Sequence, residues 1–534
     1  MPYYKDLREH VRALESRGKL VRIREAINKD TELMPLVRWQ FRGLEEEQRS
    51  AFLFEQVTDS KGRRYSMPVL VGALASSTEI YATGMMCGEP QEIMEKWARA
   101  ELNPIPPVLV PTGPVHEVVL TGEDLTREGG GLDMIPSPIS TPGFDNAPYW
   151  PAGHWVTKDP ETGIRNVGNY RVQVKARNRT GTFVHSFNDL VTHWKKCKAR
   201  GIPLVAAIAV GTVPAISYCA VGKFPYGVDE YGVAGGLAGE PIELVKCKTV
   251  DLEVPATAEL VVEGRITIEE LEPEGPHGEH TGYMSGRLLQ PYFDITCITH
   301  RNDAIFSCII SQFPPSESSK IRGLAEEYRL YKFLRYDCGL SGVREVAFPE
   351  SCGGRHMCVI RLRKIAKADA WQALYAAAAR NPSIGKYFIA VDEDIDPRDA
   401  DAVNWALAMR TQPQQDTQVV VGRAPSPGEY SAAPPDETSM EAMTYPGPTG
   451  GSALLIDATM PWGYPPIALP RKDHMERARW LWEKLELPRL KPKVPWHGYS
   501  LGYWSEEDEA EAEMATNGDY YRVGETAKQR RVKA

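Results

Sequence analysis

Residues 272–283 are Glu-Pro-Glu-Gly-Pro-His-Gly-Glu-His-Thr-Gly-Tyr, and the chain is organised around them. The first nine of these residues hold three carboxylates and two imidazoles. The glycines and proline of Gly275–Gly278 exclude a helix, so a bent loop is predicted. A bend can bring Glu274 and Glu279 into one cavity, where two close carboxylates cannot both ionise cheaply. The stretch is therefore a candidate for acid–base chemistry, and the alternative is an acidic turn that faces solvent.

The composition is that of a globular protein of about three domains, at ~150 residues per domain. The chain has 534 residues, of which 42% are hydrophobic and 25% charged. It carries 62 basic and 71 acidic residues, and this balance argues against a nucleic-acid partner. We find no run of 18 apolar residues and no apolar signal core at the start. The nine cysteines lack zinc-ligand spacing, which favours reduced thiols in a cytoplasmic protein without a membrane span.

Residues 1–107 are predicted to form an N-terminal α/β domain. Apolar periodicity predicts a helix over residues 4–17 and another near 90–102. Short β-branched runs predict strands at residues 20–23 and 69–72.

Residues 108–310 change to a β-rich texture, with short strands separated by turns, which indicates a barrel-like domain. One helix is predicted around residues 189–199. The runs at 293–299 and 304–310 flank a polar turn, and this pattern predicts a hairpin.

Residues 311–490 alternate between helical and strand patterns, which predicts an α/β domain. Residues 386–391 and 418–421 are predicted to be buried strands within it. Residues 491–534 form a helical and charged tail. Earlier in the chain, the glycine-rich run Gly232–Gly239 fits no phosphate-binding fingerprint, so close packing of a helix is the favoured interpretation.

Arg171 enters a β-run directly after Asn169 and Tyr170. Arginine grips carboxylates bidentately, so a buried Arg171 between Glu274 and Glu279 would form an acid–base–acid array. The alternative is an arginine that only neutralises a core carboxylate.

Asn166, His185 and Glu230 together offer an amide oxygen, an imidazole and a carboxylate. This set suits Mn²⁺ or Mg²⁺, which commonly keeps phosphate oxygens as further ligands. Spacing alone does not show that the three side chains meet.

With these motifs the chain resembles the UbiD family of reversible decarboxylases, which use prenylated flavin mononucleotide (prenylated FMN). The resemblance covers most of the chain and rests on residues 6–23, 158–168, 245–256, 274–283, 391–396 and 456–459. It implies an α+β and α/β fold: an N-terminal α/β section, a central split β-barrel like those of flavin reductases, and a C-terminal α/β domain that helps to build oligomers.

The resemblance also implies roles for individual residues. The family's Glu–Arg–Glu triad corresponds to Glu274, Arg171 and Glu279. Its Mn²⁺, with K⁺ nearby, would be held by Asn166, His185 and Glu230, with Asn188 as the alternative to His185. The residues expected to contact the cofactor are Asn166, Gly168, Asn169, Tyr170, Arg171, His185 and Glu230.

Two positions depart from the family pattern. Ala453 stands where the family usually has a lysine near the cofactor phosphate, so that charge would have to come from elsewhere, such as Lys320 or Arg322. His277 stands where an aromatic residue is common. A histidine there could tune Glu279, touch a polar substrate or point to solvent.

The implied enzyme is a carboxy-lyase acting on an aromatic, heteroaromatic or α,β-unsaturated acid. Losing CO₂ from an sp² carbon requires an electron sink, which the prenylated flavin supplies through a covalent adduct. Arg171 would orient the carboxylate, and Glu279 would donate the proton. A flavin prenyltransferase would supply the cofactor, and a homo-oligomer, dimer or hexamer, is expected. The alternatives are a flavin oxidoreductase and a non-catalytic subunit that keeps the fold.

Overall fold

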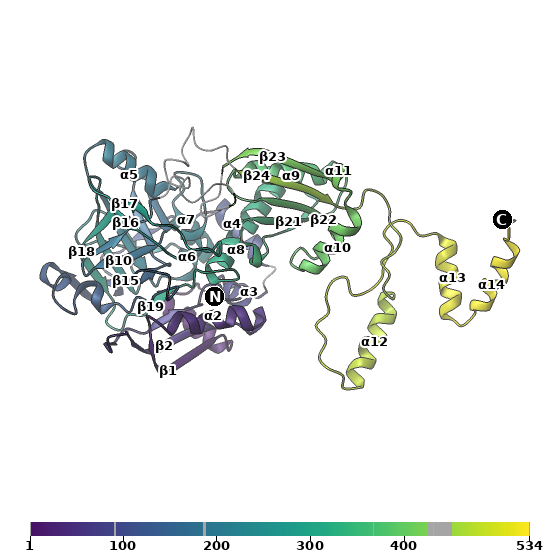
Figure 1. The fold of residues 1–534 in the computed structure, drawn as a ribbon, viewed down its shortest axis with the longest axis horizontal. Coiled ribbons are helices and arrows are strands. Elements are labelled where there is room, and N and C mark those ends of the chain that lie inside the picture. Colours follow the sequence, from purple (N-terminus) through teal and green to yellow (C-terminus); the bar gives the residue numbers. More distant parts are fainter. Residues whose placement is uncertain are drawn as a thin grey trace.

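The computed structural model describes residues 2–89, 92–184, 188–366, 368–424, 431 and 451–532. The chain forms two α/β sections on either side of a central curled sheet, with an extended C-terminal arm (Figure 1). The predicted order of α/β section, split barrel and α/β section is confirmed. In the described residues, no helix has the length and apolar character needed to cross a membrane.

The N-terminal sheet has the strand order β1-β2-β4-β19, with β3 beside β2. Its strands are β1 (Leu20–Asn28), β2 (Ala51–Thr58), β3 (Arg64–Tyr65), β4 (Val69–Val71) and β19 (Phe306–Cys308). The helices of this section are α1 (Leu7–Ser16), α2 (Leu33–Gly43), α3 (Thr78–Gly84) and α4 (Glu92–Leu102). Its apolar face shares one core with the central sheet, because Phe54 and Val69 pack in the same cluster as Trp155 and Phe293.

The central sheet is antiparallel and has the order β7-β10-β11-β18-β15-β12-β8-β9, with β6 beside β18. Its strands are β6 (Val118–Thr121), β7 (Tyr149–Trp150), β8 (His154–Lys158), β9 (Arg165–Asn169), β10 (Val172–Ala176), β11 (Arg179–Gly181), β12 (Leu204–Val210), β15 (Leu260–Ile266) and β18 (Tyr292–His300). Two small sheets accompany it: β14 (Glu253–Pro255), β13 (Glu243–Lys246) and β5 (Val108–Leu109) form one, and β16 (Glu272–Glu274) and β17 (Leu288–Gln290) form the other.

The predicted hairpin at residues 293–310 is wrong. β18 pairs with β15, β11 and β6 inside the central sheet, whereas β19 leaves it and pairs in parallel with β4. The polar turn between them therefore connects two sheets and does not close a hairpin.

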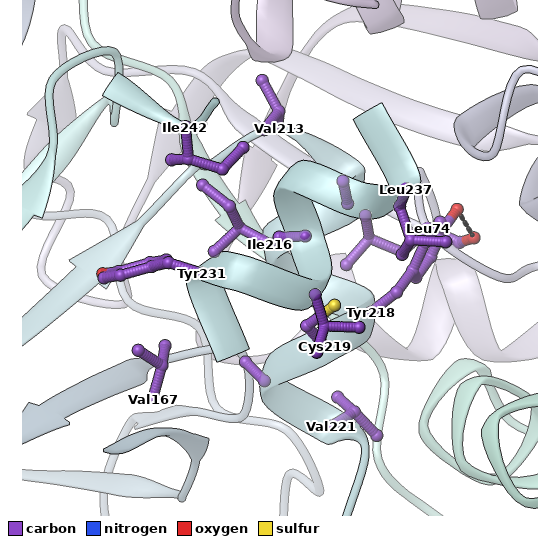
Figure 2. Packing of buried hydrophobic residues seen from close by; sticks show 14 of the residues in the cluster. Leu74, Val167, Val213, Ile216, Tyr218, Cys219, Val221, Tyr231, Leu237 and Ile242 are labelled. Carbon is purple, nitrogen blue, oxygen red and sulfur yellow. Dashed lines mark hydrogen bonds between the residues drawn. The ribbon is translucent and has the colours of Figure 1, made fainter. Parts of the chain in front are cut away.

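The helices α6 (Pro214–Val221) and α7 (Glu230–Ala238) pack tightly behind β9. Figure 2 shows Ile216, Tyr231 and Leu237 of these helices in one apolar cluster with Val167 of β9. Helix α7 also packs closely against α4, and its glycines allow that contact, since a Cβ at Gly236 would lie 2.7 Å from the Ala100 carbonyl oxygen of α4. The close-packing interpretation of this glycine run is confirmed.

The C-terminal sheet has the order β20-β21-β22-β24-β23. Its strands are β20 (Val343–Ala347), β21 (Met357–Leu362), β22 (Tyr387–Asp392), β23 (Thr417–Arg423) and β24 (Gly451–Ala458), and its helices are α9 (Asp369–Arg380), α10 (Ala400–Arg410) and α11 (Pro413–Asp416). Residues 418–421 were predicted to be buried, and this is wrong. They belong to the edge strand β23, where Val419 and Val421 are 62% and 77% exposed.

Helix α8 (Glu317–Lys332) joins the central and C-terminal parts. It contacts α4 and α6 on one side and β20 on the other. At its first residue, the buried Glu317 carboxylate accepts hydrogen bonds from the backbone N–H groups of Gly72, Leu74 and Ala75, at 2.9–3.1 Å. These bonds tie the start of α8 to the N-terminal section.

The chain ends in an arm that contains α12 (Lys472–Lys484), α13 (Glu506–Thr516) and α14 (Tyr520–Gln529). Figure 1 shows these helices apart from the rest of the molecule. Within the described residues 451–532, none of the side chains on these three helices is buried.

Substituting Gly236 by alanine should destabilise the protein, because the added methyl group collides with backbone carbonyls of α4 and its following turn. We expect a cost of about 1–3 kcal/mol in the free energy of unfolding, measured by chemical denaturation. Gly232→Ala is the matched control on the same helix. Its nearest neighbour would be Pro104 at 3.7 Å, so a gain of about 0.5–1 kcal/mol is expected. Equal effects at both positions would contradict the packing argument.

Candidate active site

Arg171 lies at the corner between β9 and β10, and it is 8% exposed. Its Nε donates a hydrogen bond to Oε1 of Glu274 at 2.9 Å, and its Nη2 donates to the second oxygen of the same carboxylate. Its Nη1 donates to Glu279 and to Oγ of Ser285, the latter at 3.0 Å. The predicted array of Glu274, Arg171 and Glu279 is thus brought together. The Phe183 ring covers the guanidinium, whose central carbon is 3.9 Å from the ring centroid.

The two glutamates come from a strand and the turn that follows it. Glu274 ends β16 and is 1% exposed, and Gly275 then turns the chain with a φ of 91°. A side chain at Gly275 would be strained by this φ and would meet the Gly286 carbonyl, so glycine is required there. Further along, the Glu279 N–H donates to the Tyr283 carbonyl at 3.0 Å, which closes the turn.

The charges of the array support one another. Burial raises the pKa of the Glu279 carboxyl, but the neighbouring His280 ring and the Arg171 charge outweigh burial, so this pKa lies well below its ordinary value. Burial lowers the pKa of Arg171, and the charges of Glu274 and Glu279 more than reverse that effect. The resting site therefore holds an ionised Glu279 beside a charged Arg171.

Two histidines of the loop lie near Glu279; His277 is buried and His280 is partly buried. His280 places Nδ1 3.6 Å from Oε2 of Glu279, and burial together with the Arg322 charge lowers the pKa of His280 to about 4. His277 is 2% exposed, stacks on Tyr149 with 4.2 Å between ring centroids, and places Nδ1 3.6 Å from an Asp145 oxygen. His277 therefore does not point to solvent, which was one of the three possibilities for this residue.

Asn166 and Glu230 also lie side by side. Asn166 is in β9 and Glu230 is the first residue of α7, and they are 4% and 6% exposed. Oε2 of Glu230 accepts a hydrogen bond from the N–H of Val167, the residue that follows Asn166, at 2.9 Å. Burial raises the pKa of Glu230 to about 8. Asn166 Nδ2 is buried without a hydrogen-bond partner.

His185 lies outside the described residues. The alternative ligand, Asn188, is the N-cap of α5 (Asp189–Ala199), where its side-chain oxygen accepts from the Val191 N–H at 2.9 Å. In the described parts of the chain, no three or more His, Cys, Asp or Glu side chains gather as a metal site.

The other predicted cofactor residues surround Asn166. Tyr170 is partly buried, and its ring occupies the space that a Cβ at Gly168 would need. The Asn169 side chain donates from Nδ2 to the Pro151 carbonyl at 2.8 Å, while its Oδ1 is buried without a partner.

Sequence reasoning missed two ionisable residues near these groups, Asp189 and Lys223, whereas Arg322 was among its candidates. Asp189 interacts electrostatically with Glu230, and burial raises the pKa of Asp189. Lys223 interacts with Asp189, and Arg322 with Glu279. Asp189 begins a helix and Lys223 lies in a loop, and neither belongs to a distinctive motif. Their proximity to the site could therefore be recognised only in the folded structure.

Comparisons with known proteins agree across most of the chain. Residues 11–101, 108–314 and 319–458 match the N-terminal, Rift-related and C-terminal domains of 3-octaprenyl-4-hydroxybenzoate carboxy-lyase. An uncharacterized protein of Aquifex aeolicus is 31% identical, and the match covers 90% of this chain and 99% of that one.

Two solved structures are similar over the same extent. The UbiD-class enzyme HmfF from Pelotomaculum thermopropionicum, in complex with FMN, is 31% identical with a TM-score of 0.77, and the match covers 89% of this chain and all of HmfF. The vanillic acid decarboxylase of Sedimentibacter hydroxybenzoicus in its closed form is 27% identical with a TM-score of 0.76, and the match covers 91% of this chain and all of that one.

The fold and the matching domains define a carboxy-lyase. The chain belongs to the UbiD family of decarboxylases.

Substituting Arg171 by methionine should leave Glu274 buried without a countercharge. We expect a cost of about 3–5 kcal/mol in the free energy of unfolding, and partial recovery in the double variant Arg171→Met/Glu274→Met. Lys175→Met, on the strand β10 that follows Arg171, is the control. Lys175 pairs with Glu272 at 2.9 Å, and the Glu272 side chain is more exposed than that of Glu274, so a cost of about 0–1 kcal/mol is expected. If both arginine and lysine variants cost the same in chemical denaturation, the Arg171 pair is not a buried charge pair.

Proposed function

We propose that the protein catalyses reversible, non-oxidative decarboxylation of an aromatic, heteroaromatic or α,β-unsaturated acid with prenylated FMN. The observation that carries the proposal is the buried Arg171 held between Glu274 and Glu279. The flavin assignment is supported by HmfF, which has been solved with FMN and, in an evolved dimeric form, with prenylated FMN. A flavin prenyltransferase would supply this cofactor, and a dimer or hexamer is the proposed assembly.

The residues near β9 fit a cation that binds a flavin phosphate. Asn166 offers an amide oxygen, and its Nδ2 is buried without a hydrogen-bond partner; the Glu230 carboxylate is buried and accepts from the Val167 N–H. Amide and carboxylate oxygens are suitable ligands for Mn²⁺ or Mg²⁺. We propose that K⁺ binds beside this divalent ion. Coordination of Glu230 by a cation would lower its raised pKa and offset the cost of burying it.

Loss of CO₂ from an sp² carbon leaves an electron pair with no stable place on the acid itself. When bound, a prenylated flavin supplies the electron sink for that pair.

Arg171 would orient the departing carboxylate. Its guanidinium is fixed by Glu274 through Nε and Nη2, and Nη1 bonds to Glu279 and Ser285, so the second N–H of Nη2 is the donor left for an acid. The Phe183 ring covers the guanidinium plane, and this cation–π contact favours the charged form of Arg171 and restricts its orientation. The carboxylate leaves as neutral CO₂, which the guanidinium holds weakly.

Glu279 would carry the proton. An acid carboxylate that binds Arg171 weakens the attraction between Arg171 and Glu279 and adds a like charge, which raises the pKa of Glu279. Glu279 can then take up a proton and deliver it to the carbon that lost CO₂. In the carboxylation direction the ionised form, which the resting site holds, removes the proton from that carbon.

Substituting Glu279 by glutamine should reduce exchange of labelled bicarbonate into aromatic acids by about 10²–10⁴-fold, because it removes the proton carrier. The protein is produced with a flavin prenyltransferase and assayed against a panel of acids. Flavin content, measured by absorbance, should not change.

Glu272→Gln is the control for this substitution. Glu272 lies two residues before Glu274 and pairs with Lys175 and Arg179, so its replacement should leave exchange intact. Full exchange in Glu279→Gln would show that another group carries the proton. Absence of exchange in the wild-type protein, despite full loading with prenylated flavin, would refute the proposed function.

A further inference from the structure

Lys223, Arg322 and Arg355 come from three segments that converge beside the acid–base loop. Lys223 follows α6, Arg322 lies in the second turn of α8, and Arg355 precedes β21. The turn at Gly353–Gly354 brings two of these segments together. A Cβ at Gly354 would lie 3.1 Å from the Gly323 nitrogen of α8.

The same turn also contacts the loop that carries Glu279. A Cβ at Gly353 would lie 3.4 Å from the His280 carbonyl oxygen. Arg322 and Arg355 both interact electrostatically with His280, and Arg322 also interacts with Glu279. The cations therefore border the space into which Glu279 faces.

These cations have few partners. Among the described residues, neither Lys223 nor Arg322 makes a hydrogen bond or an ion pair. Arg355 has Glu326 at 4.0 Å, but Glu326 also serves Arg380 at 3.2 Å. Lys223, Arg322 and Arg355 are partly buried, and partly buried positive charges with few ion pairs favour binding of an anion.

A neighbouring arginine extends the positive field. Arg329 is 4% exposed, lies over the Phe224 ring at 4.4 Å, and keeps Nε and Nη1 buried without a hydrogen-bond partner. Lys223 interacts with Arg355, Arg322 and Arg329. Burial, followed by this mutual repulsion, lowers the pKa of Lys223 to about 8 and that of Arg322 to about 10.

Of the positions considered from the sequence, Arg322 belongs to this group, whereas Ala453 and Lys320 do not supply its charge. Ala453 is 1% exposed in the apolar core of the C-terminal sheet. Lys320 is engaged with Glu46 at 2.6 Å and lies 3.7 Å from Glu350.

We propose that Lys223, Arg322 and Arg355 form an anion subsite next to the acid–base loop, which binds phosphate or carboxylate oxygens. Arginine presents paired donors that match both groups, and lysine adds a point charge. The anion is either the phosphate of the flavin or a second acidic group on the substrate. Its identity rests on the proposed function, but the existence of the subsite does not.

The test compares the wild-type protein with Lys223→Met, Arg322→Met and Arg355→Met. Affinities for FMN and riboflavin are measured by flavin fluorescence, since these two ligands differ by the phosphate alone. Affinities of the FMN-loaded protein for benzene-1,4-dicarboxylate and benzoate are measured by calorimetry. Lys332→Met is the matched control, because Lys332 lies on α8 and pairs with Asp337 at 3.1 Å.

Loss of one charged contact should reduce one of these two preferences by about tenfold or more. A fall in the preference for FMN over riboflavin identifies the phosphate as the ligand. A fall in the preference for the dicarboxylate alone identifies a second acidic group of the substrate. The ligand-free Lys223→Met and Arg322→Met variants should unfold at a higher temperature than the wild-type protein, because each removes a partly buried cation that has no ion pair among the described residues.

The inference is overturned if the wild-type protein shows neither preference, or if the three variants keep both preferences as Lys332→Met does. A protein that shows these preferences but exchanges no labelled bicarbonate would retain the subsite and lose the proposed function.

Discussion

The ion pair between Arg171 and Glu274 is the constraint on which the central part of the molecule depends. Both side chains are almost wholly buried, and a charge of either kind is costly there without its partner. The corner between β9 and β10 must therefore meet the end of β16, although the two are separated by about a hundred residues of sequence. Glu279 is a second carboxylate bonded to the same guanidinium, and its side chain is more accessible than that of Glu274.

The strand β9 links this array to the second group of polar residues. Asn166 lies near one end of β9, and Arg171 follows the other end, so a short extended segment sets the spacing between them. Close packing of α7 behind β9 then places Glu230 beside Asn166. The glycines of α7 lower its intrinsic helix stability, but they allow α7 to pack closely against α4. The apolar cluster in Figure 2 thus determines where a carboxylate stands.

The texture of the segments predicted the three-part architecture, and the resemblance to the UbiD family predicted the meeting of Arg171, Glu274 and Glu279. Prediction failed where a distant partner decides the outcome and no family motif marks that partner. β19 has the composition of a hairpin strand, yet its pairing with β4 is set by the N-terminal sheet. Val419 and Val421 have the character of core residues but occupy a sheet edge. Lys223 and Asp189 sit in unremarkable sequence, and tertiary contacts alone bring them to the site.

The hydrogen bonds of Glu317 fix the first residue of α8 to the N-terminal section, so a rigid-body rotation of α8 would take this end as its pivot. At 1.5 Å per residue, Arg322 lies ~7.5 Å from that pivot and Lys332 about 22 Å from it. A swing of the C-terminal sheet that rotates α8 about this end would therefore displace Arg322 about one third as far as Lys332. The position nearest the acid–base loop is the one that such a movement disturbs least.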